Sequence, residues 1–199
     1  MLESTRDKIA AGIHRLLPAR AARRFARQQD GAAAVEFALV ALPFFALIFA
    51  ILETALVFFA GQTLETAVSD TGRLIMTGQA QNAGFSQDDF NNAVCARLAG
   101  GLFDCTNGVY VNVKSYSSFG TVNNAAPVKN GDFDSTKMTY SNTNPGCIVA
   151  VSLYYQWPIY VSLLGDNLST LNGNKRLLAA TSVFRNEPFG AGGQGGGPC

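Results

Sequence analysis

The sequence predicts an α+β protein: one long N-terminal helix followed by a small head that contains an antiparallel sheet. Residues 32–61 form an apolar segment long enough for a bilayer-spanning helix, and helical periodicity continues beyond them. Three strand-like segments follow at 109–116, 147–157 and 177–184. Helices followed by a run of strands are typical of the α+β class.

The charges are divided unevenly around the apolar segment. Residues 1–31 hold seven of the 15 basic side chains and three of the 14 acidic ones, so the rest of the chain has eight bases, eleven acids and a net charge of −3. Basic flanks stay on the cytoplasmic side of a membrane. We therefore expect a cytoplasmic leader over 1–31, a transmembrane helix over 32–61 and an extracytoplasmic head.

Other interpretations of the N-terminus remain open. A cleaved secretory signal peptide has a shorter basic region than residues 1–31, and its apolar core is followed by a cleavage site of small residues. The sequence VFFAGQT is a poor match to such a site. An organelle transit peptide is a further alternative. The arginine cluster ARAARRFARQ would also suit nucleic acid, but contact with lipid headgroups explains it, so we expect no nucleic-acid partner.

One carboxylate, Glu36, stands at the start of the apolar run, five residues after Gly31. This spacing resembles the processing site of type IV prepilins, which a dedicated peptidase cleaves after the glycine on the cytoplasmic side. A glycine lets a protease approach the backbone closely. The new amine of Ala32 would be cationic, with a reference pKa of about 7.7–8.0, and Glu36 would lie one helical turn from it or from a neighbour's amine. The alternative is a chance glycine and glutamate beside an anchor.

The stretch GAAAVEFALVALPFFALIFAILE resembles the N-terminus of TadE-like proteins, minor pilins (pseudopilins) of tight-adherence (Flp) pilus systems. Glu36 with Phe37, Leu42 with Pro43, and Glu53 match the family pattern. The stretches YYQWPIY and VFRNEPF resemble the end of its extracytoplasmic domain.

This resemblance implies pilus assembly and cell adhesion as the function, and prepilin-peptidase cleavage between Gly31 and Ala32. It also implies a bacterial inner-membrane location with a periplasmic head. The expected partners are the inner membrane, the prepilin peptidase, and other pilin and pilus-assembly subunits. Whether the subunit is at the tip, the shaft or the base of a pilus stays open.

Two further residues of the apolar segment are assigned to assembly. A proline is tolerated in a membrane helix where neighbours satisfy the freed carbonyl, which accounts for Pro43. Glu53 follows Glu36 by about 25 Å of helix, near the outer headgroups, so a structural role is expected rather than catalysis.

Beyond the span, residues 62–80 are assigned to a helical extension, and the helix itself is predicted to run to about Thr77. Apolar residues recur there at three- and four-residue steps and form one stripe: Leu56, Ala60, Leu64, Ala67, Val68, Thr71, Leu74 and Ile75.

The head is predicted over 81–189. Ser86 and Asp89 suit a capping box that starts a helix with an apolar face of Phe90, Val94 and Leu98, ending at Gly100. Pro158 is expected to end the second strand or to mark it as an edge.

Two segments of the head are rich in turn-forming and polar residues. The loop 117–146 contains KNGDFD, a candidate hairpin turn around Gly131. A loop of this length is typical of a functional segment, but the sequence does not identify what the loop binds. Asp132 and Asp134 lack the repeated ligands of a calcium loop, so a turn is preferred. The glycine-rich tail 190–199 is expected to be flexible.

All four cysteines follow the span, where an oxidising compartment permits disulfides. Three pairings are possible. Cys95–Cys105 is preferred as a helix tied to its following loop, and Cys147–Cys199 remains by subtraction.

Catalytic chemistry is not expected. The one histidine, His14, belongs to the leader, so the head lacks Ser-His and Cys-His nucleophiles, and no zinc motif, metal site or cofactor site is predicted. The alternative functions are an uncleaved single-span envelope protein whose periplasmic head binds a partner and, third, a membrane-anchored hydrolase.

Overall fold

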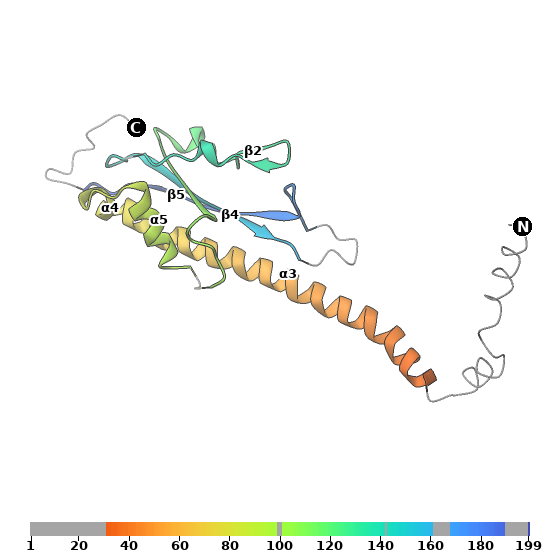
Figure 1. The fold of residues 1–199 in the computed structure, drawn as a ribbon. Helices are drawn as coiled ribbons and strands as arrows, with labels where there is room; N and C mark the ends of the chain where they lie inside the picture. Colours follow the sequence, from red (N-terminus) through yellow and green to blue (C-terminus); the bar gives the residue numbers. More distant parts are fainter. Residues whose placement is uncertain (1–30, 99–100, 142, 161–167, 190–198) are drawn as a thin grey trace, which may run out of the picture. The chain divides into compact units, whose positions relative to one another are not determined.

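The computed structural model describes residues 31–98, 101–141, 143–160, 168–189 and Cys199. Three helices come first, followed by a three-stranded sheet that a small hairpin interrupts in the sequence (Figure 1). In chain order the elements are α3 (Ala32–Met76), α4 (Gln79–Asn82), α5 (Gln87–Cys95), β1 (Val109–Tyr116), η2 (Phe119–Thr121), β2 (Val128–Lys129), β3 (Asp132–Phe133), η3 (Ser135–Lys137), β4 (Ile148–Pro158) and β5 (Lys175–Arg185). The predicted α+β class, with its long N-terminal helix and antiparallel sheet, is confirmed.

Helix α3 contributes to two compact units, which divide between Ile48 and Phe49. The described part of the first unit is residues 31–48. The second unit contains the rest of α3 together with the head, and the packing described below lies within it.

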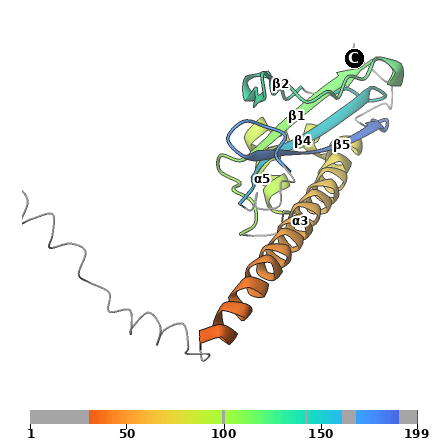
Figure 2. The same ribbon diagram turned by 90° about the vertical axis from the view of Figure 1, so that its right-hand side faces the viewer.

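The main sheet is antiparallel in the order β1–β4–β5, with β4 in the centre (Figure 2). Val151 of β4 is opposite Val113 of β1 on one side and Ser182 of β5 on the other. Pro158 is the last residue of β4 and pairs with Lys175. The proline therefore ends a central strand, and the edge-strand alternative is wrong.

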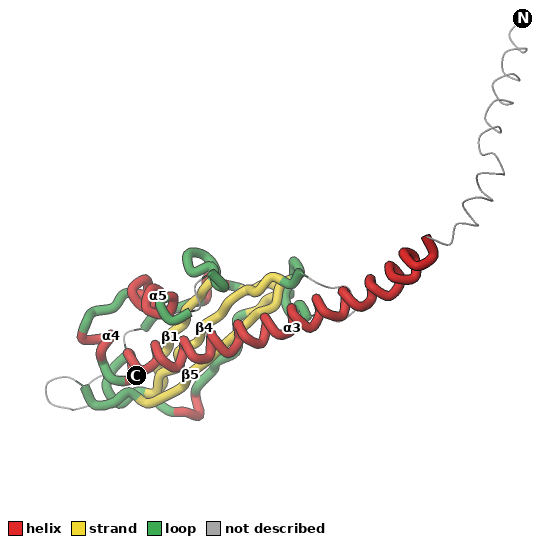
Figure 3. The backbone as a smooth tube through the Cα atoms, turned by 90° about the horizontal axis from the view of Figure 1, so that it is seen from below, coloured by secondary structure: helices red, strands yellow, loops and turns green. Residues whose placement is uncertain are grey.

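One face of this sheet packs against α3 and α5 (Figure 3). Successive side chains of a strand point to opposite faces, so Val109, Val111 and Val113 of β1 share the helix-covered face. At Gly72 of α3 the backbone approaches β5 closely, because a Cβ there would lie 3.0 Å from a ring carbon of Phe184. A small residue at this position lets the helix lie close to the sheet.

The buried stripe of α3 differs from the predicted one at its start. Ala60, Leu64, Ala67, Val68, Thr71 and Ile75 are buried as expected, but Leu56 is 48% exposed and Val57 is 5% exposed in its place. Residues three and four positions before Ala60 both suit helical periodicity, so the sequence pattern alone does not choose between them. Val57 belongs to the same buried core as Leu178, near the start of β5, and this packing selects the three-residue step.

The predicted capping box begins α5. The Oγ of Ser86 accepts a hydrogen bond from the Asp89 backbone N–H, and the Ser86 backbone N–H donates to the Asp89 carboxylate at 2.9 Å. Hydrogen bonds from the Ser86 side chain and backbone lower the pKa of Asp89 below its ordinary value.

The far end of α5 was predicted incorrectly, because the helix ends at Cys95. Leu98 still reaches the core, through a tighter turn in which its N–H donates to the Cys95 carbonyl at 3.3 Å. The predicted stop, Gly100, lies outside the described residues.

The second face of the sheet is covered in part by the β2–β3 hairpin. Its turn residues Asn130 and Gly131 have φ values of 55° and 82°, which suits the two-residue type I′ turn and confirms the predicted hairpin. Phe133 packs on Tyr110 and Tyr154, with ring centroids 5.0 and 5.4 Å apart.

The end of α3 gives a first testable prediction. Gly78 has φ of +75°, and a Cβ there would lie 2.3 Å from Phe189, whereas Gly84 has φ of +66° and open space around it. Both Gly→Ala changes incur a left-handed backbone cost of about 1–2 kcal/mol. Gly78→Ala adds an overpacking cost of about 1–3 kcal/mol, so it should lower the free energy of unfolding by more than Gly84→Ala.

The measurement is urea unfolding of the full-length protein in detergent, followed by fluorescence of Trp157, the one tryptophan of the chain, which is buried in the head. Equal losses of stability for the two variants would show that Phe189 does not cover Gly78.

Candidate functional site

The N-terminal part of α3 presents large apolar side chains without a protein covering. Val35, Phe37, Leu39, Val40, Leu42, Phe44, Phe45, Leu47, Phe49, Ile51 and Leu52 are all about half exposed or more, and Phe37 is 72% exposed. By length and composition α3 is the one helix of the described residues that qualifies as a membrane span. An exposed apolar surface of this extent requires lipid or other helices around it.

Glu36 is the single charged side chain of α3 before Glu53, and it is exposed. Its carboxylate has no hydrogen-bond or ion-pair partner within the described part of the chain. It lies four residues after Ala32, the first residue of α3, and therefore on the same helix face one turn away. An acceptor at this position is free to pair with a group from outside the described residues.

Gly31 precedes α3 directly, and a Cβ built on it meets no atom within 4 Å. Neither packing nor backbone conformation in the described structure therefore requires a glycine here. The basic leader over 1–30, which precedes this residue, lies outside the described residues, as does His14.

Pro43 lies inside α3 and is exposed, and the helix continues on both sides of it. Proline has no N–H, so the carbonyl four residues earlier, on Leu39, lacks its usual helical donor. The structure thus places this residue on the same uncovered part of the helix as Phe37 and Glu36.

Glu53 has a different environment from Glu36. It is 6% exposed, and its Oε1 accepts a hydrogen bond of 2.5 Å from the backbone N–H of Tyr160, which lies just after β4. Because Glu53 and Tyr160 both belong to the second compact unit, this bond ties the second part of α3 to one end of the sheet. The contact supports the structural role expected for Glu53.

The four cysteines form two disulfides in the structure, Cys95–Cys105 and Cys147–Cys199. These are the two pairs that the sequence analysis preferred. Cys105 comes ten residues after Cys95, the last residue of α5, whereas Cys199 is linked to Cys147, just before β4. Residues 190–198 of the tail lie outside the described residues.

The described residues contain no group of three or more histidine, cysteine or acidic side chains that suits a metal ion. Their buried polar atoms belong mainly to structural hydrogen bonds, such as that from Asn186 to the hydroxyl of Thr143.

The described residues form an α+β fold in which one long helix has an apolar N-terminal part that qualifies as a membrane span and a second part that packs on a small antiparallel sheet. Residues 31–73 match the family described as TadE-like protein. This match confirms the TadE-like resemblance of the N-terminal segment, and it includes Glu36, Phe37, Pro43 and Glu53.

TadE-like proteins are a pilus-associated structural family, and the chain is similar to them over this segment. None of the curated proteins or solved structures matches it significantly. The matched segment ends within α3, and the C-terminal resemblance therefore stays a prediction.

Sequence reasoning did not find two features of the head. One is the partner of Glu53, since Tyr160 is 107 residues away along the chain. The other is a polar pocket beside β1, whose lining comes from one strand and from the loop that covers it. The long polar loop was the only sequence signal for this pocket.

The Glu53 contact gives a second prediction. Hydrogen bonds to charged groups contribute about 1.5–3 kcal/mol, so Glu53→Ala should lower the free energy of unfolding by about that amount. The matched control is Glu65→Ala on the same helix, because Glu65 is exposed and should change stability by about 0.5 kcal/mol at most.

Urea unfolding followed by Trp157 fluorescence measures both variants in detergent. If Glu53→Ala leaves stability unchanged and yet abolishes incorporation into pili, Glu53 acts between subunits and not within the head.

A third prediction concerns the disulfides. Peptide mapping by mass spectrometry under non-reducing conditions should recover Cys95 linked to Cys105 and Cys147 linked to Cys199. A peptide that links Cys95 or Cys105 to either of the other two cysteines would contradict this pairing.

Proposed function

We propose that this chain is a minor pilin (pseudopilin) of a tight-adherence (Flp, type IVb-like) pilus system. It is inserted in the bacterial inner membrane through the first part of α3, with the leader in the cytoplasm and the head in the periplasm. A prepilin peptidase cleaves after Gly31, and the mature subunit joins other pilin and pilus-assembly subunits through its helix.

The observation that carries this proposal is the state of Glu36. Its carboxylate is exposed and unpartnered among the described residues, inside the segment that matches the TadE-like family. In lipid near the cytoplasmic edge the carboxylate remains hydrated. When subunits pack together and exclude water, an α-amine at Ala32 of a neighbour supplies the missing partner, and the favourable contact forms only in the assembly.

The length of the uncovered helix supports the proposed topology. Residues 32–52 precede Glu53, the first buried charged residue of α3. These 21 residues span about 31 Å at 1.5 Å per residue, close to the hydrocarbon thickness of about 30 Å. Leu56, Phe58 and Phe59 are also exposed, so the apolar surface continues past Glu53 toward the boundary at 61 expected from hydropathy.

An uncleaved, single-span envelope protein with a partner-binding head is the second candidate. The polar pocket of the head favours this function as much as it favours a pilin with a binding role. The two candidates differ in whether the leader is retained and in whether α3 engages other subunits.

A fourth prediction tests processing. Co-expression with the matching prepilin peptidase should give a mature chain whose N-terminal sequence starts AAAVEF. Gly31→Val should block cleavage, because the side chain hinders approach of the protease to the backbone. It should leave the fold intact, since nothing lies within 4 Å of a Cβ at this position.

Gly61→Val is the matched control, because a Cβ at Gly61 also meets no atom within 4 Å and the residue lies far along the same helix. This variant should be cleaved normally. Retention of residues 1–31 by the unmodified chain would reject the processed pilin and leave the uncleaved anchor.

A fifth prediction concerns Glu36. A charge-assisted contact contributes about 1.5–3 kcal/mol, and its loss should lower the equilibrium constant for assembly roughly tenfold or more. Glu36→Gln and Glu36→Ala should both reduce the amount of subunit recovered in sheared pilus fractions, while membrane fractionation shows unchanged insertion. An equal loss of insertion and assembly would count against pairing with an amine.

A further inference from the structure

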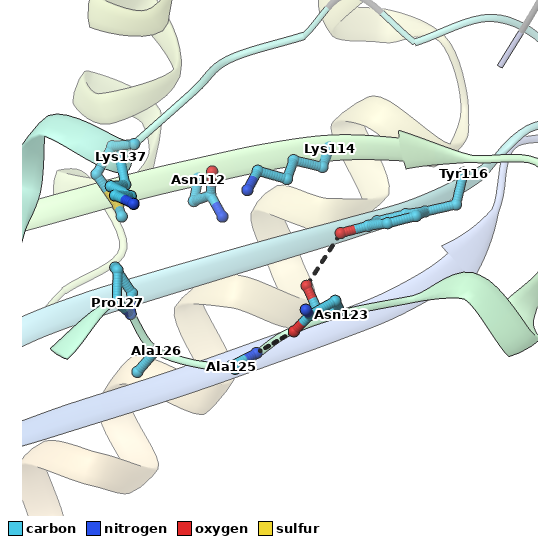
Figure 4. A pocket seen from close by; sticks show the side chains of 9 residues that line it. Asn112, Lys114, Tyr116, Asn123, Ala125, Ala126, Pro127 and Lys137 are labelled. Atoms are coloured by element: carbon cyan, nitrogen blue, oxygen red, sulfur yellow. Dashed lines mark hydrogen bonds between the residues drawn. The ribbon is translucent and has the colours of Figure 1, made fainter. Parts of the chain in front are cut away.

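The face of β1 that points away from α3 carries a row of polar side chains. Val109, Val111 and Val113 belong to the core, so the alternating residues Asn112, Lys114 and Tyr116 lie on the opposite face. The segment 123–138 passes over this face, and between strand and segment is a pocket of about 300 Å³ (Figure 4). Its lining consists of Asn112, Lys114, Tyr116, Asn123, Ala125, Ala126, Pro127, Lys137 and Met138.

The covering segment is fixed at several points. At one end the hydroxyl of Tyr116 donates to the backbone carbonyl of Asn123 at 3.0 Å. At the other end Phe133 packs on Tyr110, and the backbone N–H of Asn172 donates to the Gly131 carbonyl at 2.8 Å. These contacts hold the segment over the strand, so the pocket is a formed feature of the head.

The strand side of the pocket supplies hydrogen-bond donors. The Oδ1 of Asn112 accepts from both the backbone N–H and the hydroxyl of Thr139, at 3.1 and 3.0 Å. These two bonds fix the orientation of the amide and direct its NH₂ group toward the pocket. No acceptor for this NH₂ group is present within the described ranges. Figure 4 shows this amide next to the Lys114 side chain.

The charge of the pocket is positive. Lys114 and Lys137 both line it, and no carboxylate does. Asp134 lies outside the lining, and hydrogen bonds from Thr136, with smaller contributions from Lys137 and Lys129, lower the pKa of Asp134. Lys114 therefore lies in a lining that contains no acidic side chain.

The remaining walls suit a small ring with hydroxyl groups. Ala125, Ala126, Pro127 and Met138 offer a compact apolar surface to C–H groups, while the oxygen atoms of Tyr116 and the Asn123 side chain can accept hydrogen bonds. A volume of about 300 Å³ is at the small end of ligand sites, which suits one sugar unit.

We propose that this pocket binds an acidic sugar, a single hexuronate unit, with its carboxylate on the Lys114 ammonium and the Asn112 amide and its ring against the 125–127 segment. The Lys114 ammonium and the Asn112 amide offer donors from one side of the pocket, which suits the two oxygens of a carboxylate. The site lies on the sheet face opposite α3, so a ligand bound there leaves the helix available for assembly.

The test is ligand-observed saturation-transfer NMR of the full-length protein in detergent, titrated with glucuronate, glucose and glucose 6-phosphate. Glucuronate should bind, and glucose, the same ring without the carboxylate, should bind at least about tenfold more weakly. Equal binding of glucuronate and glucose, or no binding of glucuronate, would overturn the proposal. Tighter binding of glucose 6-phosphate would also overturn it, in favour of a phosphate ester.

Three variants locate the site. Lys114→Gln should weaken glucuronate binding about tenfold or more. Lys129→Gln is the matched control, since Lys129 is exposed on β2 and outside the pocket, and it should leave binding unchanged. A similar loss in both lysine variants would indicate attraction by the general charge of the head and overturn the proposal.

Asn112→Asp covers the case in which Lys114→Gln disturbs folding. It keeps the oxygen that accepts from Thr139 and replaces the free NH₂ by a second carboxylate oxygen, so it should abolish glucuronate binding while Trp157 fluorescence shows an intact head. Undiminished binding by this variant would exclude the Asn112 side of the pocket.

Discussion

A single helix must satisfy two different surroundings, and the arrangement of the chain follows from this constraint. Before Glu53, α3 is apolar apart from Glu36 and exposed around its circumference, as a helix in lipid or in a bundle requires. After Glu53 its buried residues form a stripe with small side chains at Ala60, Ala67 and Gly72, which allows the sheet to approach closely. Glu53 marks the change, and its carboxylate caps the backbone at the end of β4.

Much of the fold could be predicted because its elements have local causes. The capping box at Ser86, the Asn130–Gly131 turn and the alternation of Val109, Val111 and Val113 are each encoded within a few residues. The errors occurred where two local solutions were equivalent. Leu56 and Val57 both fit the helical period, and only contact with β5 decides between them. The end of α5 depends on a tight turn that still buries Leu98, and neither periodicity nor the following glycines indicate it.

The candidate site divides in the same way. The residue types of the N-terminal segment indicated Glu36, Pro43 and Glu53. A charge or a proline in an apolar helix has a free-energy cost, so its presence points to a specific role. What each residue contacts was not predictable, since the partner of Glu53 comes from a segment beyond β4. The pocket was hidden for a related reason. Lys114 is an ordinary strand residue in the sequence, and only the register of β1 and the position of the 123–138 segment make it part of a site.

The two faces of the sheet are covered differently. Helices α3 and α5 pack on one face, and the pocket proposed to bind a sugar lies on the other. On the helix-covered face, apolar side chains of β1, β4 and β5 are buried against α3 and α5, and a polar ligand there would have to displace the core. The other face is covered by a loop segment that touches it through Phe133 and Tyr116 and leaves space between these contacts. Because the helix is fixed to one side of the sheet, the loop is where side chains can vary without disturbing either the membrane segment or the core. Because the core fills the helix-covered face, the space for the proposed ligand lies on the opposite face of the head.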